Sequence, residues 1–238
     1  MKKVKPRWGY FSKGEWSLWG ASVLLILISF CMFDRENLLT LAASLVGATS
    51  LIFIARGNPI GQMLMVVFSV LYGVISFAFS YYGEMITYLG MTAPMAVFAL
   101  ISWLKHPYNG NRAQVKVNRL TGREILGMLL LSGAVTGVFY WILKAFDTAH
   151  LGISTVSVTT SFIAVYLTFR RSAYYALAYA ANDGVLIVLW LLAAGENAAY
   201  LSVVSCFLMF LANDVYGFIS WRRMSRHQQM SCARCEAA

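Results

Sequence analysis

The chain has 238 residues, of which 59% are hydrophobic and only 12% charged, and its formal net charge is +9. Water-soluble domains carry about 25% charged residues, so this composition excludes an ordinary soluble enzyme or binding domain. Because a bilayer core takes about 20 apolar residues per helix, the length suffices for about seven or eight spans and leaves no room for a soluble domain.

In chain order, eight apolar segments predict membrane-spanning helices. They are 16–33, 38–55, 60–82, 85–104, 124–146, 152–169, 173–195 and 197–221. Helix-capping signals precede four of them: Ser12-x-x-Glu15, Asn37, Asn58-Pro59 and Thr121-x-x-Glu124. No small-residue cleavage site follows the first segment, so we expect it to remain in the protein.

The basic residues predict an orientation, because they lie mainly in alternate connections. Of the 19 lysines and arginines, only Arg35 and Lys144 fall in the other connections. The positive-inside rule then places both termini and the connection 105–123 in the cytoplasm. This topology, together with contact to anionic lipid, explains the positive charge, so we do not expect nucleic-acid binding.

Two short motifs occur twice. Gly83-Glu84-x-x-x-Tyr88-Leu89 recurs as Gly195-Glu196-x-x-x-Tyr200-Leu201, and Ile101-Ser102-Trp103 recurs as Ile219-Ser220-Trp221. Duplicated helix bundles are typical of transporters, whose substrate lies at the seam between the halves. We expect the two Gly-Glu turns on the outer surface, where Glu84 and Glu196 are solvated.

The repeats predict an all-α integral membrane protein built from two parallel three-helix units and a linking helix, plus an extra N-terminal helix. The expected parts are the basic N-terminus with the extra helix at 1–37, the first unit at 38–104, a cytoplasmic loop at 105–123, the linking helix at 124–146, the second unit at 152–221 and a basic cytoplasmic tail at 222–238. One intervening span gives both units the same orientation, which disfavours inverted repeats.

The seventh predicted span carries a mixed aromatic and polar face. Its members fall at helical spacing: Tyr175, Tyr179, Asn182, Asp183, Leu186 and Trp190. Aromatic rings can stack on a flat heterocycle, and an asparagine amide can donate and accept hydrogen bonds in the same plane. The alternative is an interhelical face with a polar clamp, or a membrane anchor in the case of Trp190.

Further candidates for substrate binding lie on the other spans: Asn213, Asp214, Tyr216 and Trp221 on the eighth, and Gln62, Tyr88 and Trp103 in the first half. For Asn213 the alternative is an interhelical hydrogen bond. Asp183 and Asp214 require a cavity or a partner within the membrane. They could bind a cationic cargo, carry protons or donate structural hydrogen bonds. No lysine or arginine lies near a predicted span centre, so a nucleoside-like cargo fits better than a phosphorylated one.

Hydroxyl side chains crowd the start of the sixth span, at 154–161. We expect this segment to face protein, with hydroxyls returning hydrogen bonds to their own backbone. A route for a polar cargo is the alternative interpretation.

Residues 38–221 resemble the PnuC-type vitamin transporters. The resemblance rests on Asn213-x-x-Tyr216-Gly217-x-x-x-Trp221, on Arg170-Arg171 and on Tyr174-Tyr175 with Asn182. It implies a three-plus-one-plus-three helical fold, often trimeric, in the bacterial inner membrane. It also implies facilitated diffusion of nicotinamide riboside, an unphosphorylated precursor for NAD biosynthesis, with trapping by cytoplasmic phosphorylation.

Other functions stay open from the sequence alone. The same fold is associated with thiamine and other vitamins, and proton coupling is a second alternative. A membrane-embedded enzyme is disfavoured, since no catalytic triad or phosphate loop appears. We expect no cofactor and no metal, because Cys232-x-x-Cys235 with His227 supplies only three ligands.

Overall fold

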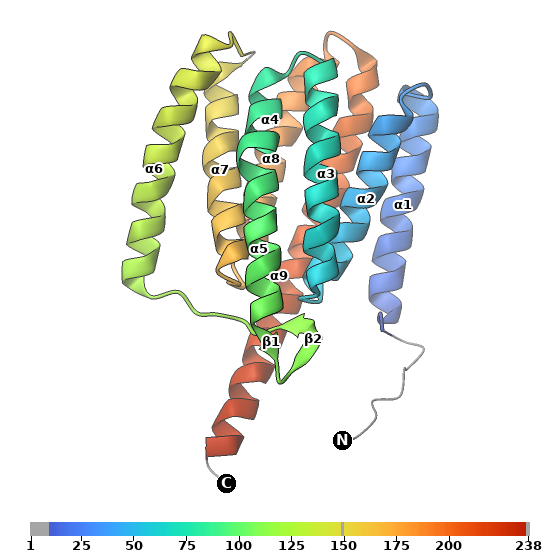
Figure 1. Ribbon diagram of the computed structural model, residues 1–238. Coiled ribbons are helices and arrows are strands. Elements are labelled where there is room, and N and C mark those ends of the chain that lie inside the picture. Colours follow the sequence, from blue (N-terminus) through green and yellow to red (C-terminus); the bar gives the residue numbers. More distant parts are fainter. Residues whose placement is uncertain (1–9, 149, 237–238) are drawn as a thin grey trace.

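The computed structural model describes residues 10–148 and 150–236, with side chains described as far as residue 231. Long helices lie side by side in one bundle (Figure 1), and a small β-hairpin sits at the end from which the last helix projects. We call this the hairpin end and the opposite one the far end.

The helices follow the predicted spans closely. They are α1 (Lys13–Phe33), α2 (Leu38–Ala55), α3 (Pro59–Ala78), α4 (Tyr82–Thr87), the π-helix η1 (Tyr88–Thr92), α5 (Ala93–Lys105), α6 (Gly122–Ala145), α7 (Leu151–Phe169), α8 (Tyr175–Ala194), the 3₁₀ turn η2 (Ala198–Tyr200) and α9 (Leu201–Glu236). Counting α4, η1 and α5 as one, eight helices within the described residues are long and apolar enough to cross a membrane. The predicted all-α membrane fold is therefore confirmed.

Six helices form a closed ring in the order α2, α3, α5, α7, α8 and α9, with α9 packing back on α2. The first three-helix repeat consists of α2, α3 and the helix α4–η1–α5; the second consists of α7, α8 and α9. The two repeats are parallel, as the sequence predicts, and α6 connects them. Outside the ring, α1 packs on α2 and α9, and α6 packs on α7.

The repeated Ile-Ser-Trp motif joins the two halves at the hairpin end. The indole nitrogen of Trp103 donates to Thr168 O in α7 at 2.9 Å, and Trp221 donates to Ile54 O in α2 at 2.8 Å. The neighbouring serine hydroxyls bond the adjacent carbonyls of Phe169 and Ala55 in the same way. Since helix C-termini leave carbonyls without an intrahelical partner, each repeat caps the first helix of the other.

The first helix is more than an addition to the core, because α1 begins like α6. Capping boxes are present at both starts, and N-cap bonds also form at Asn37 and Asn58, as predicted. Glu15 of the first box forms an ion pair with Arg56 at 2.8 Å, and Glu124 of the second pairs with Arg170. Both arginines follow the first helix of a repeat directly. The similarity of the halves therefore extends to four helices each.

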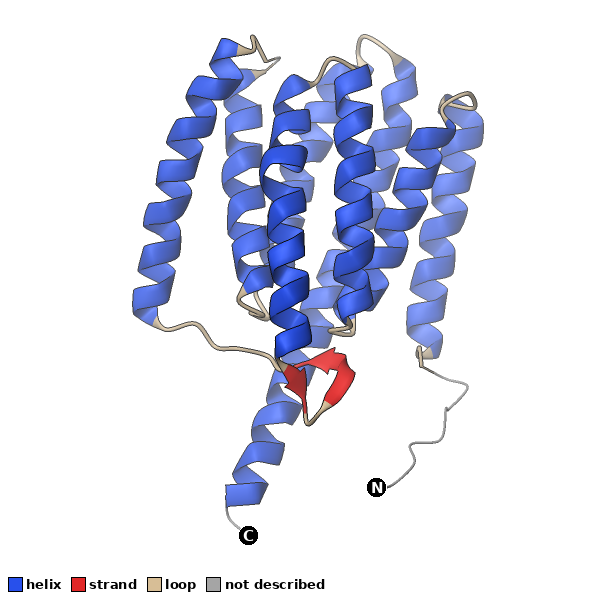
Figure 2. Ribbon diagram, viewed as in Figure 1, coloured by secondary structure: helices blue, strands red, loops and turns tan. Residues whose placement is uncertain are grey.

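Two features of the hairpin end differ from the expectations. The connection 105–123 contains an antiparallel hairpin, β1 (Pro107–Tyr108) and β2 (Asn111–Val115), coloured red in Figure 2. The region 222–238, expected as a tail, continues α9 as a helix to Glu236. Gln228 explains why the helix lies against the hairpin, because its amide accepts from Val117 N at 2.9 Å and donates to Val115 O at 3.1 Å.

Candidate functional site

Two aspartates face each other inside the ring. Asp183 of α8 and Asp214 of α9 are each 3% exposed, and their carboxyl groups are close enough to interact directly. Two carboxylates this close cannot both be ionised without a counter-charge. Oδ2 of Asp183 has no hydrogen-bond partner among the described residues. The partner that each acid needs inside the membrane is thus the other acid, and the pair retains capacity for a ligand.

Tyrosines surround the aspartate pair. Tyr179 lies close to both carboxyl groups and to Thr168, Tyr175 lies close to Asp214, and Tyr88 of η1 lies close to Asp183. These rings come from both halves of the molecule, since η1 belongs to the first. The arrangement combines carboxyl groups with flat aromatic surfaces, the two kinds of group that attract an organic cation.

Asn182 is buried beside the pair, at 2% exposure. Its Oδ1 accepts hydrogen bonds from Thr160 Oγ1 at 2.8 Å and from Ser161 Oγ at 2.9 Å, both in α7. Its Nδ2 has no protein partner within the described chain, so one side of the amide stays available. The structure therefore contains the interhelical polar clamp that the sequence left open as an alternative. The clamp uses Oδ1 of Asn182 and leaves Nδ2 available.

The hydroxyl-rich start of α7 faces protein, as expected. Ser154, Ser157 and Ser161 are buried. Thr155 and Thr159 return hydrogen bonds to backbone carbonyls one turn earlier, at 2.7 and 3.0 Å. The prediction of back-bonding is confirmed for these threonines.

A second aromatic cluster lies farther toward the far end. Trp190 is fully buried and donates to the Tyr72 hydroxyl at 2.7 Å, so it is not a surface anchor. The ring centroids of Tyr72 and Tyr88 are 4.3 Å apart, and those of Tyr81 and Trp190 are 4.7 Å apart. Burial raises the pKa of the Tyr81 phenol, with Tyr200 and Glu196 contributing. Tyr81 therefore adds a neutral ring to the cluster at neutral pH.

The space beside Tyr72 is nearly closed. A cavity of about 10 Å³ lies between α2, α3 and α9, with Ser44, Phe68 and Cys206 among its walls. That volume holds about one water molecule. A cargo of nucleoside size can pass here only after the helices move apart.

The other predicted residues lie between helices. Asn213 of α9 donates to Ser22 Oγ of α1 at 2.9 Å. Tyr216, also of α9, lies beside Glu15 at the start of α1. Trp103 and Trp221 cap helices, as described above. Gln62 is 1% exposed, and its Nε2 has no partner in the described part of the chain. Asn213, Tyr216, Trp103 and Trp221 thus make contacts between helices, and Oδ1 of Asn213 has no hydrogen-bond partner among the described residues.

One expectation about the Gly-Glu motifs is wrong. Glu196 is exposed, but Glu84 is 1% exposed and lies in the first turn of α4. The reason is visible in the spacing, because 18 residues separate Glu84 from Ser102 whereas 24 separate Glu196 from Ser220. At 1.5 Å per helical residue, six fewer residues place Glu84 about 9 Å deeper. This unequal spacing is the sequence signal that identifies Glu84 as a buried acid.

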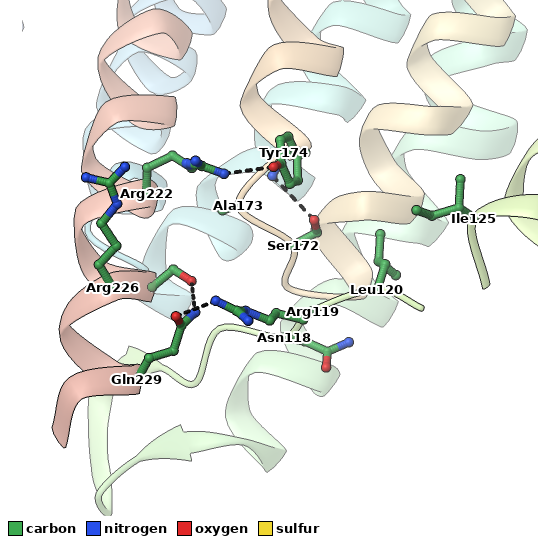
Figure 3. Close-up of a pocket in the computed structure, with 11 residues that line it drawn as sticks. Asn118, Arg119, Leu120, Ile125, Ser172, Ala173, Tyr174, Arg222, Arg226 and Gln229 are labelled. Atoms are coloured by element: carbon green, nitrogen blue, oxygen red, sulfur yellow. Dashed lines mark hydrogen bonds between the residues drawn. The ribbon is translucent and has the colours of Figure 1, made fainter. Parts of the chain in front are cut away.

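A basic pocket of about 330 Å³ opens at the hairpin end (Figure 3). Arg119, Arg222 and Arg226 contribute to its lining, which contains no acidic residue. Arg222 donates to the Tyr174 hydroxyl at 2.7 Å. Burial and the neighbouring Arg170 lower the pKa of Arg171, in the loop that precedes the pocket residues Ser172 and Ala173. This pocket repels cations and is chemically opposite to the aspartate site.

The paired cysteines of the last helix, Cys232 and Cys235, have side chains outside the described residues, so the prediction about them stays untested. Among the described residues, no group of three or more acids, cysteines and histidines is placed to hold a metal ion.

Comparison with known proteins identifies the family. A family model described as nicotinamide mononucleotide transporter matches residues 37–223. The nicotinamide riboside transporter PnuC of Neisseria mucosa is 28% identical over 224 residues, which cover 90% of this chain and 85% of that protein. The crystal structure of the vitamin B3 transporter PnuC has the same fold, with a TM-score of 0.81, 24% identity, and coverage of 92% of this chain and 95% of that one. The chain therefore belongs to the nicotinamide mononucleotide transporter family.

Proposed function

We propose that this protein carries nicotinamide riboside across the bacterial inner membrane. The observation that carries the proposal is the buried pair Asp183 and Asp214 with tyrosine rings around it. Nicotinamide riboside contains a pyridinium ring, which is flat and positively charged. Carboxyl groups and aromatic faces attract such a ring together. The names of the similar PnuC transporters support the same cargo.

The charge of this site favours the riboside over the mononucleotide. A phosphate group needs arginine, lysine or backbone donors, whereas the residues around Tyr179 and Tyr88 are acidic or neutral. Two carboxyl groups would repel a phosphate. Most basic residues of the described chain lie instead at the hairpin end, where Arg119, Arg222 and Arg226 line a separate pocket.

The site residues proposed from the structure are Asp183, Asp214, Asn182, Tyr175, Tyr179, Tyr88, Trp190 and Gln62. The Nδ2 of Asn182 suits the carboxamide oxygen or a ribose hydroxyl, because its N–H groups can donate hydrogen bonds while Oδ1 accepts from α7. Asn213, Tyr216, Trp103 and Trp221 hold the surrounding helices in place. Transport then proceeds by rocking or gating of the two halves around one midplane site.

Facilitated diffusion is the proposed mode, with phosphorylation in the cytoplasm trapping the cargo for NAD biosynthesis. The positive charges at the hairpin end support a cytoplasmic location of that end and of both termini. A homotrimer is proposed from the family resemblance. Proton-coupled transport is the second candidate, because a close carboxyl pair can take up and release a proton.

Proteoliposomes loaded with purified protein test the function. We expect saturable uptake of radiolabelled nicotinamide riboside without a proton or sodium gradient, and accumulation only when a riboside kinase and ATP are enclosed. Accumulation that requires a pH gradient, with no kinase present, would support the coupled mechanism instead.

Binding measurements test the cargo. Isothermal titration calorimetry with nicotinamide riboside, nicotinamide mononucleotide, thiamine and riboflavin should show tight binding of the riboside only. Preference for thiamine would keep the fold and change the substrate; preference for the mononucleotide would contradict the charge argument.

A further inference from the structure

Glu84 is a third acid inside the membrane region. Its carboxyl group has neither an ion-pair partner nor a well-formed hydrogen bond among the described residues. It is 1% exposed, and neither of its oxygens has a well-formed hydrogen bond among the described residues. Ser157 of α7 lies nearby, but its hydroxyl is also without a partner there. The ion pairs of the described chain, Glu15 with Arg56 and Glu124 with Arg170, do not involve Glu84.

Burial of this kind carries a cost. An ionised carboxylate placed in the interior without a counter-charge is strongly unfavourable, and acids at membrane depth mark functional positions for that reason. The molecule does not need Glu84 for helix capping, since Tyr82 starts α4 and no side-chain cap bond is present. A cation passing beside the carboxyl group would remove the cost.

Aromatic rings lie next to Glu84. Tyr88 is four residues later and lies on the same helix face, and its centroid is 4.3 Å from that of Tyr72. Both tyrosines are close enough to interact electrostatically with Glu84. Tyr88 is also close to Asp183, so it lies between the outer acid and the central pair. Glu84 and the central pair therefore share Tyr88 as a common neighbour.

The helix itself is irregular at this point. Residues Tyr88–Thr92 form the π-helix η1, directly after the turn that contains Glu84. Single-turn π-helices occur frequently at functional sites, where an extra residue changes the direction of side chains. In the second half, the counterpart Glu196 lies in an exposed turn before η2. The irregularity accompanies the buried acid of the first half.

We infer that Glu84, with the rings of Tyr72 and Tyr88, forms an outer binding station for a flat organic cation on its way to Asp183 and Asp214. The inference rests on the proposed function and adds a residue to it. The station selects cargo by charge. The carboxylate attracts a cation and replaces the water that the cation lost on entering the membrane, whereas it does not attract a neutral ring.

The test compares two ligands that differ in charge. Nicotinamide riboside is cationic, and its reduced dihydropyridine form has the same ribose and carboxamide without the charge. We expect Glu84→Gln to weaken binding of the cationic form about 30-fold or more and to leave the affinity for the reduced form unchanged. Glu84→Asp should keep most of the preference, because it keeps the charge. Glu196→Gln is the matched control from the other repeat and should change neither affinity.

Equal losses for both ligands, or no loss for either, would overturn the inference. If the wild-type protein binds neither form, the proposed function itself fails, and this outcome is distinct because it precedes any substitution. If the Glu84 variants do not fold, a labelling experiment on the wild-type protein tests the same inference. A hydrophobic carbodiimide should modify Glu84, as read by mass spectrometry of its peptide, and the cationic riboside should protect it while the reduced form does not. Equal protection by both forms would also contradict the inference.

Discussion

The indole rings of Trp103 and Trp221 lie 5.3 Å apart, and each donates its N–H to a carbonyl at the end of the first helix of the other repeat. The two rings contact each other where the halves meet. A tripeptide that appears twice in the sequence therefore performs the same task twice, in exchanged positions. This reciprocal arrangement explains how two similar three-helix units close into a ring.

Replacing either tryptophan with phenylalanine should destabilise the protein by about 1–3 kcal/mol, because a buried carbonyl loses its donor. The double variant should be less destabilised than the sum, with a coupling of about 0.5–1.5 kcal/mol from the ring contact. Denaturant unfolding in mixed micelles measures both values. Strictly additive losses would show that the two rings do not depend on each other.

The ion pairs of the two capping boxes should differ in strength. The side chain of Glu15 is 3% exposed and that of Glu124 is 31% exposed. Glu15→Gln should lower the free energy of unfolding by about 1–3 kcal/mol, since Arg56 loses its buried charged partner. Glu124→Gln should cost less than about 1 kcal/mol, and added salt should erase that smaller difference. Similar losses for both variants would contradict this ranking, and unfolding at low and high salt provides the measurement.

Gly61 permits a close approach of the α2 and α3 backbones. A methyl group added there would lie 2.7 Å from Ile54 N and 2.8 Å from Ser50 O, both backbone atoms. Gly61→Ala should therefore cost about 1–3 kcal/mol or more through overpacking. Gly127→Ala in α6 is the control, because nothing lies within 4 Å of its added carbon, and it should stabilise the helix by up to about 1 kcal/mol. Thermal unfolding distinguishes the two, and a harmless Gly61→Ala would contradict the close packing.

Asp183→Asn and Asp214→Asn should each weaken binding of nicotinamide riboside by about tenfold or more, because each removes negative charge from the same site. The double variant should not show the product of the two losses, since the carboxyl groups act as a pair. Calorimetric titration gives the affinities. Wild-type affinity in both single variants would remove the aspartates from the substrate site.

Two asparagines separate binding from packing. Asn182→Ala should weaken riboside binding while the protein still folds and assembles, because one side of its amide has no protein partner. Asn213→Ala should instead lower stability by about 0.6 kcal/mol, the typical value of an interhelical hydrogen bond in membranes, and leave affinity unchanged. The comparison needs titration and unfolding of both variants. Unchanged affinity in Asn182→Ala would exclude it from the site.

Most of the fold could be predicted from the sequence, because apolar length, capping residues and basic connections each follow directly from the properties of a bilayer. The capping boxes at Ser12 and Thr121 form as expected. Contacts between segments that are distant in the sequence are harder to predict. That Asn213 faces Ser22 depends on where α1 packs. The sequence signal for this contact is the seven-residue spacing of Glu15, Ser22 and Ser29, which places all three on one buried face of α1. The helical extension of α9 depends on Gln228 meeting the hairpin, a pairing over 113 residues.

The sequence indicates the candidate site residues of the second half more directly than the buried acid of the first half. Helical spacing indicates Asn182 and Asp183, because both lie on the mixed face that includes Tyr175, Tyr179 and Trp190. The match between the two Gly-Glu motifs predicts a solvated turn at Glu84, whereas the six-residue difference in spacing to the Ile-Ser-Trp motif indicates burial. Local similarity identified the repeat, whereas depth in the membrane depends on the position of the whole helix.

The bond from Trp221 to Ile54 spans 167 residues. During synthesis the carbonyl end of α2 is made early, and its donor arrives only with the final helix. The carbonyls of Ile54 and Ala55 therefore lack their side-chain donors until the last helix has been inserted. Completion of the ring is thus a late event of biogenesis, because it requires the insertion of α9.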